Sequence, residues 1–190
     1  MKLPTLLVSL AAAAAAQKVT LGTGQNGPYK AGWWTEPGLA RHTIFGPIDP
    51  PAGLKVPVML WGNGACSANG LLFQRMLLNT ASHGILTIAN GAPNGGGGQT
   101  TVALQKQALE WIMTNAGKGK YANVVTRIAA AGQSCGGLLT YDLEGDPRVT
   151  ALGIFNSGSL QAGQRQKVAR FTKPIAYFLG GKSDIAYAQV

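Results

Sequence analysis

The chain has 190 residues, of which 46% are hydrophobic and 12% are charged, and its formal net charge is +9. This length supports one sizeable hydrophobic core and is too short for two ordinary domains. The lysines and arginines are dispersed, and only Lys118 and Lys120 stand close together. The composition therefore argues against a nucleic-acid groove and favours a solvated basic surface.

The first 16 residues have the pattern of a secretory signal peptide. Met1 and Lys2 precede an apolar stretch, and a run of alanines ends at Ala16. The apolar stretch is shorter than the ~20 residues that a membrane-spanning helix needs, and alanine is only weakly apolar. We predict that residues 1–16 are cleaved, that the protein is secreted and extracellular without a membrane span, and that residues 17–190 form a single domain.

Further along the chain, apolar β-type runs alternate with helical patterns. The Gly-rich segment 22–34 is predicted to be irregular, and residues 40–53 a short strand closed by a proline turn. Further strands are predicted at 55–61, 85–90, 127–134, 149–157 and 174–181, and helices at 67–84, 100–117 and 135–146. The second helix has Thr100 or Thr101 as its cap and Gly117 as its stop. This alternation predicts an α/β fold with a mainly parallel β-sheet flanked by helices on both faces.

Ser134 is the candidate nucleophile. It lies in Gly132-Gln133-Ser134-Cys135-Gly136, which matches the G-x-S-x-G nucleophile elbow, and it follows a predicted strand and opens a predicted helix. The glycines keep side chains away from the tight turn. The alternative is an ordinary Gly-rich turn, and the strand–turn–helix context favours the nucleophile.

The loop after the strand at 55–61 is the candidate second half of an oxyanion hole. Gly62, Asn63 and Gly64 let the backbone come close, and we expect the N–H of Asn63 or Gly64 to act together with that of Cys135. A tight structural turn would need the same glycines. An even number of cysteines in an oxidising compartment favours a Cys66–Cys135 disulfide, and two reduced, buried cysteines are the alternative.

Asp184 is the candidate acid, because it lies just beyond the end of the strand predicted at 174–181. A turn aspartate is the alternative. The base is not evident: His42 and His83 are the two histidines of the chain, and both precede the serine, whereas this architecture places the histidine after the acid. We therefore interpret the chain as a C-terminally shortened version of a catalytic architecture, with the last strand and helix missing and residues 175–179 exposed as a sheet edge.

Four segments together resemble small secreted fungal α/β-hydrolases of the cutinase-like and polyester-hydrolase branch. They are PVMLWGNGACSANG, ASHGILTIANGAPNG, IAAAGQSCGG and PIAYFLGGKSDIAY, and the similarity extends over most of the chain from about Gly27. The resemblance implies a carboxylic-ester hydrolase fold that acts through an acyl-enzyme on a small-molecule or polymer ester. It implies Ser134 as nucleophile, Asp184 as triad acid, and backbone N–H groups of Asn63 or Gly64 and of Cys135 as oxyanion donors.

Several features of the sequence allow interpretations other than a catalytic site. A catalytically inactive secreted binding or effector module that keeps the hydrolase shell is the alternative function. The loop 90–101 is Gly-rich but lacks the Gly-Lys-Ser/Thr ending of a phosphate-binding loop, so we interpret it as a flexible loop beside the cleft. Trp33, Trp34 and Trp61 line an apolar cleft or pack in the core. The sequence implies no cofactor and no metal, because its histidines and cysteines lack ligand spacing.

Overall fold

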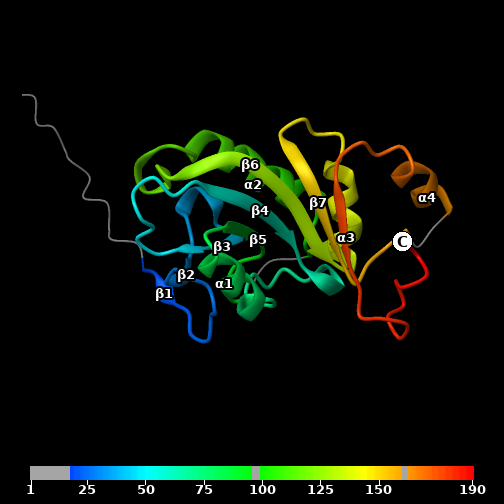
Figure 1. Cartoon of the computed structure of the whole chain (residues 1–190), viewed down its shortest axis with the longest axis horizontal. Helices are drawn as coiled ribbons and strands as arrows, with labels where there is room; N and C mark the ends of the chain where they lie inside the picture. Colours follow the sequence, from blue (N-terminus) through cyan, green and yellow to red (C-terminus); the bar gives the residue numbers. More distant parts are fainter. Residues whose placement is uncertain (1–17, 96–98, 160–161) are drawn as a thin grey trace, which may run out of the picture.

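Eight strands form one sheet in the order β1-β2-β3-β5-β4-β6-β7-β8 (Figure 1). The computed structural model describes residues 18–95, 99–159 and 162–190. The signal peptide predicted for residues 1–16 lies outside the described residues, as do residues 96–98 of the loop predicted to be flexible. The strands are β1 (Thr20–Leu21), β2 (Ala31–Trp34), β3 (His42–Pro47), β4 (Val56–Gly62), β5 (Leu86–Asn90), β6 (Val124–Gln133), β7 (Val149–Phe155) and β8 (Ile175–Phe178).

The sheet is mainly parallel. The neighbours β5, β4, β6, β7 and β8 all run in the same direction, whereas β1, β2 and β3 pair in antiparallel fashion and β3 is antiparallel to β5. Leu60 at the centre of the sheet is in register with Ile88 on one side and Ala130 on the other. The carboxyl ends of the parallel strands therefore meet at one edge, where open parallel sheets place their functional residues.

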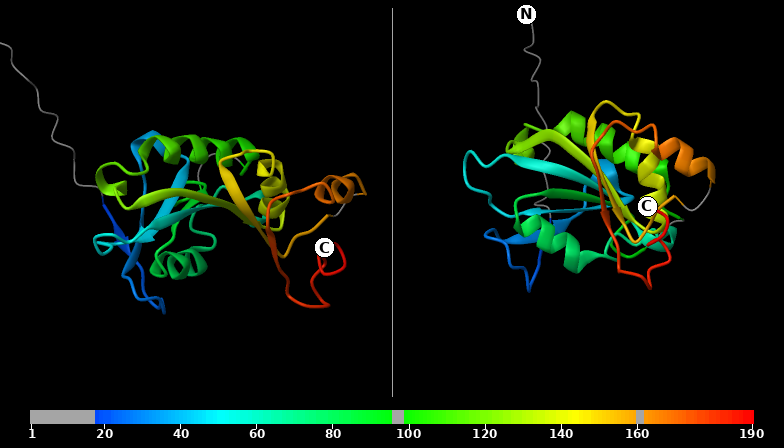
Figure 2. Two further views of the ribbon diagram at one scale, coloured as in Figure 1. Left: turned by 45° about the horizontal axis from the view of Figure 1, so that its top comes forward. Right: turned by 45° about the vertical axis from the view of Figure 1, so that its right-hand side comes forward.

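Helices cover both faces of this sheet. They are α1 (Gln74–Ser82), α2 (Val102–Asn115), α3 (Cys135–Thr140) and α4 (Ala162–Val168), with short 3₁₀ turns η1 (Pro37–Leu39), η2 (Gly64–Cys66), η3 (Gly119–Tyr121) and η4 (Tyr141–Leu143). The left view of Figure 2 shows α2 on one side of the sheet and α1 on the other. The predicted α/β fold with helices on both faces is confirmed at this level.

The core consists of two clusters, one on each face. The larger lies on the side of α2 and includes Leu60, Ile88, Leu109 and Ile112, all fully buried. The smaller lies on the side of α1 and is centred on Trp61, whose ring meets those of Phe73 and Phe155 edge to face. Of the tryptophans considered for a cleft, Trp61 is therefore a core residue.

Most predicted elements are confirmed, with differences that include β2, the start of α1, and α4. The segment 22–34 contains β2, because pairing of Trp33 with Phe45 of β3 stabilises a strand that glycine disfavours locally. Helix α1 begins only at Gln74, so Leu72 lies before it and is 47% exposed. Helix α4 was not predicted. Thr101 is the cap of α2, since its hydroxyl accepts a hydrogen bond from the N–H of Leu104.

Candidate active site

Ser134 occupies the turn between β6 and α3. Its backbone is in an unusual conformation, with φ 51° and ψ −115°, which an L-residue adopts at an energetic cost. Its N–H donates to the carbonyl of Phe155 (2.9 Å), and its own carbonyl accepts from the hydroxyl of Ser157 (2.9 Å). Contacts with the neighbouring strand therefore hold this conformation in place, in the strand–turn–helix setting that the motif predicts.

Glycines allow three pieces of backbone to meet beside Ser134. A Cβ on Gly132 would lie 2.3 Å from the carbonyl of Gly136, and a Cβ on Gly136 would lie 2.0 Å from the carbonyl oxygen of Gly62. Distances this short exclude any side chain. Glycine is therefore required at these positions because β4, β6 and α3 pack too closely for a side chain.

The loop that follows β4, residues 62–70, is fastened to the start of α3. The predicted disulfide between Cys66 and Cys135 is confirmed, with a Cα–Cα distance of 5.2 Å. A Cβ on Gly64 would overlap the side-chain oxygen of Gln133, the residue before Ser134. The structure therefore brings Gly64, Cys135 and Ser134 into one neighbourhood. Because Cys135 is the first residue of α3, its N–H has no acceptor within the helix.

The side chain of Asn63 holds this loop in shape, a role that the sequence did not reveal. It is fully buried, and its amide nitrogen donates to the carbonyls of Ser67 (3.1 Å), Asn69 (2.9 Å) and Asn90 (2.8 Å). Its oxygen accepts from the indole N–H of Trp61 (3.1 Å). Asn63 thus fixes the backbone on which its own N–H and that of Gly64 are displayed.

Asp184 lies at the same edge of the sheet, beyond the end of β8. Its carboxylate accepts hydrogen bonds from the backbone N–H groups of Gly180 and Ala186 (both 2.9 Å) and from the side-chain amide of Asn156 (2.7 Å). These bonds hold the pKa of Asp184 below its ordinary value, so the carboxylate stays ionised. The two backbone hydrogen bonds contribute most to this shift, and the bond from Asn156 adds to it.

Asn156 connects the acid to the nucleophile, and it is a second residue that the sequence did not single out. It follows β7 with φ 42° and donates its backbone N–H to the carbonyl of Phe178 in β8 (2.8 Å). The preceding residue, Phe155, accepts the N–H of Ser134. Ser134, Asn156 and Asp184 therefore follow three neighbouring strands, β6, β7 and β8.

Neither histidine reaches Ser134. His42 begins β3, three strands away from β6, and is fully buried with its Nε2–H donating to the carbonyl of Leu104 (2.9 Å). Burial lowers the pKa of His42 to about 4, so it is neutral at pH 7. His83 caps the end of α1, is exposed, and contacts the side chain of Asn26 (3.0 Å).

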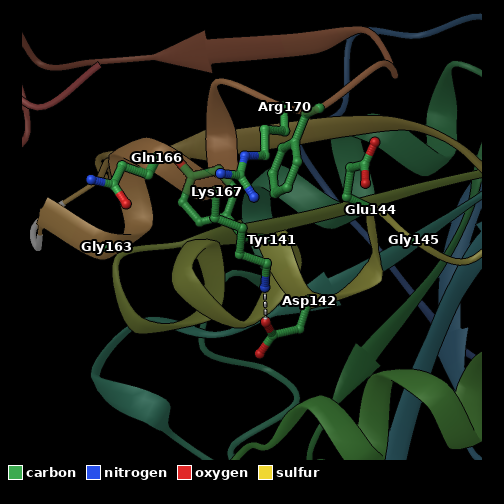
Figure 3. Close-up of a pocket in the computed structure, with 9 residues that line it drawn as sticks. Tyr141, Asp142, Glu144, Gly145, Gly163, Gln166, Lys167 and Arg170 are labelled. Carbon is green, nitrogen blue, oxygen red and sulfur yellow. Dashed lines mark hydrogen bonds and ion pairs between the residues drawn. The ribbon is translucent and has the colours of Figure 1, made fainter.

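A hollow of about 480 Å³ lies between η4 and α4, away from Ser134 (Figure 3). Its aromatic wall consists of Tyr141 and Phe171, and Lys167 closes one side through an ion pair with Asp142 (2.5 Å). None of the site residues predicted from the sequence lines this hollow.

No protein-family model matches the chain, and no curated protein is similar to it. In the described part of the chain, no helix is long and apolar enough to cross a membrane.

Proposed function

We propose that the chain is a secreted serine hydrolase of the α/β-hydrolase type that acts on carboxylic esters through an acyl-enzyme. The observation that supports this most strongly is the strained backbone of Ser134 at the carboxyl edge of the sheet, between β6 and α3. Strain of this kind persists where the surrounding structure imposes it, and it is concentrated at functional sites. The resemblance to the cutinase-like branch and the order serine, then acid, support the same proposal.

In the proposed reaction, the Ser134 oxygen attacks the ester carbonyl carbon and passes its proton to an imidazole base, which His42 and His83 do not supply and which the assay below adds. The N–H groups of Cys135 and of Asn63 or Gly64 stabilise the negative charge that develops on the carbonyl oxygen. The tetrahedral intermediate collapses, the C–O bond to the alcohol breaks, and the alcohol leaves with a proton. Water then attacks the acyl-enzyme, releasing the acid and restoring the hydroxyl. Asp184 orients the base and stabilises its cationic form.

Secretion is part of the proposal. The Cys66–Cys135 disulfide is typical of an oxidising compartment, and the pattern of residues 1–16 is that of a signal peptide. Both cysteines are only partly buried, so a reducing environment would have access to the bond.

A second candidate function is a non-catalytic binding or effector module with the same shell. The positions of the two histidines favour it, because buried His42 and remote His83 leave Ser134 without an imidazole from the described residues. The two candidates differ in one measurable property, the reactivity of the Ser134 hydroxyl.

A fluorophosphonate probe tests the proposal directly, because it labels activated serines covalently. With imidazole added as the base, we expect labelling of the wild type and of Thr114→Ala, which removes an exposed hydroxyl on α2, and none of Ser134→Ala. Hydrolysis of p-nitrophenyl butyrate with and without added imidazole, which can act as the missing general base, extends the test. Turnover by the wild type should exceed that of Ser134→Ala at every imidazole concentration.

Two results would decide against the proposal. Labelling that persists in Ser134→Ala means that another residue is reactive. If the wild type shows neither labelling nor turnover above Ser134→Ala, with imidazole present, the non-catalytic module is the better description.

A further inference from the structure

The ammonium group of Lys120 lies against two aromatic rings and a carboxylate. The Nζ atom of Lys120 lies 5.4 Å from the ring centroid of Trp34 and 5.2 Å from that of Tyr121. The same atom forms an ion pair with the carboxylate of Glu36. Two aromatic faces and one carboxylate thus surround a cation, which is the composition of the aromatic cages that bind organic ammonium ions.

The walls of this cage are fixed without help from Lys120. The indole N–H of Trp34 donates to the hydroxyl of Tyr121 (3.0 Å), and that hydroxyl donates to Glu36. The ring of Trp111 packs edge to face on Tyr121 at 5.2 Å. Trp34 and Tyr121 are only 7% and 5% exposed. The cage is therefore preorganised, so binding a cation requires little ordering of the protein.

A mostly apolar hollow of about 370 Å³ adjoins the cage. Trp34, Lys120 and Tyr121 line it, and so do the first residues of three parallel strands, Val56, Leu86 and Val124. The remaining lining includes Ile48 and two prolines, with Asp49 and Asn123 as polar members. Its volume is within the range of small-ligand pockets, which combine apolar walls with a few polar groups. The hollow can take an alkyl chain attached to the cation.

Lys120 is the more exposed partner of the ion pair: its side chain is 45% exposed and that of Glu36 is 15% exposed. Holding a long lysine side chain in one position costs side-chain entropy, which offsets part of what the contacts contribute. A ligand cation can therefore displace it. The Glu36 oxygen already accepts the Tyr121 hydroxyl, which favours a cation that attracts by charge and needs few hydrogen bonds.

We propose that Trp34, Tyr121 and Glu36 form a binding site for a quaternary alkylammonium ligand. Its cationic head replaces the Lys120 ammonium, and its chain enters the hollow. Lys120 acts as an internal competitor for the cage. This site is independent of the serine chemistry proposed above, because the hollow is lined by the first residues of β4, β5 and β6, whereas Ser134 follows the end of β6.

Calorimetric titration with hexyltrimethylammonium chloride tests the proposal. Lys120→Ala empties the cage and should bind this cation at least fivefold more tightly than the wild type. Lys118→Ala is the matched control: it removes the same charge from a lysine whose Nζ donates to the carbonyl of Thr114 (2.8 Å), and it should bind as the wild type does. Adding Glu36→Gln to Lys120→Ala should weaken binding at least tenfold. A shift of the Trp34 indole N–H signal in NMR spectra locates the ligand.

Three results would each overturn the proposal. In the first, Lys118→Ala tightens binding as much as Lys120→Ala, which makes the effect one of net charge. In the second, uncharged hexan-1-ol binds Lys120→Ala as tightly as the cation does, which means that the apolar hollow alone is recognised. In the third, no variant shows saturable binding.

Discussion

The two loops that border Ser134 are held in different ways. The loop after β4, residues 62–70, is anchored by contacts far apart in sequence: the disulfide to Cys135 and the hydrogen bond from Asn63, itself fully buried, to Asn90. The loop after β8, residues 179–186, is held by hydrogen bonds from Gly180 and Ala186 to its own Asp184, with Asn156 as the distant partner. Its residue Ile185 is 82% exposed.

Because the two loops are anchored differently, we expect one to matter mainly for stability and the other mainly for the proposed chemistry. The loop 62–70 is continuous with the core, so changes there should lower the free energy of unfolding of the whole domain. The loop 179–186 is partly solvent-exposed and carries Asp184, so changes there should alter the site while leaving global stability nearly intact. The predictions below test this contrast.

The largest effect should come from removing the disulfide. Cys66 and Cys135 are 69 residues apart in sequence, and closing a loop of that length stabilises the folded state by roughly 4 kcal/mol in the chain-entropy description. We expect urea denaturation of the double variant Cys66→Ala/Cys135→Ala to show a loss of this size. A loss below about 1 kcal/mol would mean that the other anchors of the loop are sufficient.

Gly136→Ala should destabilise by about 3 kcal/mol, because the added methyl group meets backbone rather than a movable side chain. The Cβ would lie 2.0 Å from the carbonyl oxygen of Gly62. Gly145→Ala is the matched control, since nothing lies within 4 Å of a Cβ there. Chemical denaturation of both variants measures the contrast. Equal stabilities would contradict the tight approach of α3 to β4.

Lowering the pH should first destabilise the region around the loop 62–70. His42 pairs with Asn90, the residue whose carbonyl Asn63 holds. Burial lowers the pKa of His42 from 6.5 to about 4, so the folded state binds this proton less well than the unfolded state. The resulting stability is fully present above pH 6.5, is lost as the pH falls towards about 4, and amounts to about 3 kcal/mol.

Urea denaturation of the wild type and of His42→Gln at pH 7 and pH 4.5 checks this expectation. The wild type should lose more stability than the variant, which has no titrating group at this position. Asp184 does not interfere, because hydrogen bonds lower its pKa and keep it ionised at both pH values. Equal losses in the two proteins would show that His42 accepts a proton freely in the folded state.

The smallest effect on stability should come from Asp184→Ala. The carboxylate is at the surface, and we expect an unfolding midpoint within error of the wild type. Under the proposed function, the same variant should lose most of its imidazole-dependent turnover of p-nitrophenyl butyrate, because the acid orients the base. Clear destabilisation of Asp184→Ala would contradict this prediction and show that the loop 179–186 contributes to global stability.

Most strands and helices could be predicted because their signals are local. Runs such as 85–90 and 149–155 are continuously apolar or alternate regularly, and the cap of α2 at Thr101 is a short-range contact. The segment of β2 could not be predicted, because glycine obscures its pattern and its stability comes from pairing with β3.

The same distinction between local signals and long-range contacts applies to the candidate site. The sequence by itself determined where Ser134 stands, between a strand and a helix, and favoured the pairing of the two cysteines, because both inferences depend on short motifs and on residue count. Only the tertiary structure decided that the Asn63 side chain gathers three carbonyls, that Asn156 holds Asp184, and that Trp34, Tyr121 and Glu36 surround Lys120. These partners are up to 87 residues apart, and nothing in their local sequence records the approach, which arises when the strands assemble into one sheet.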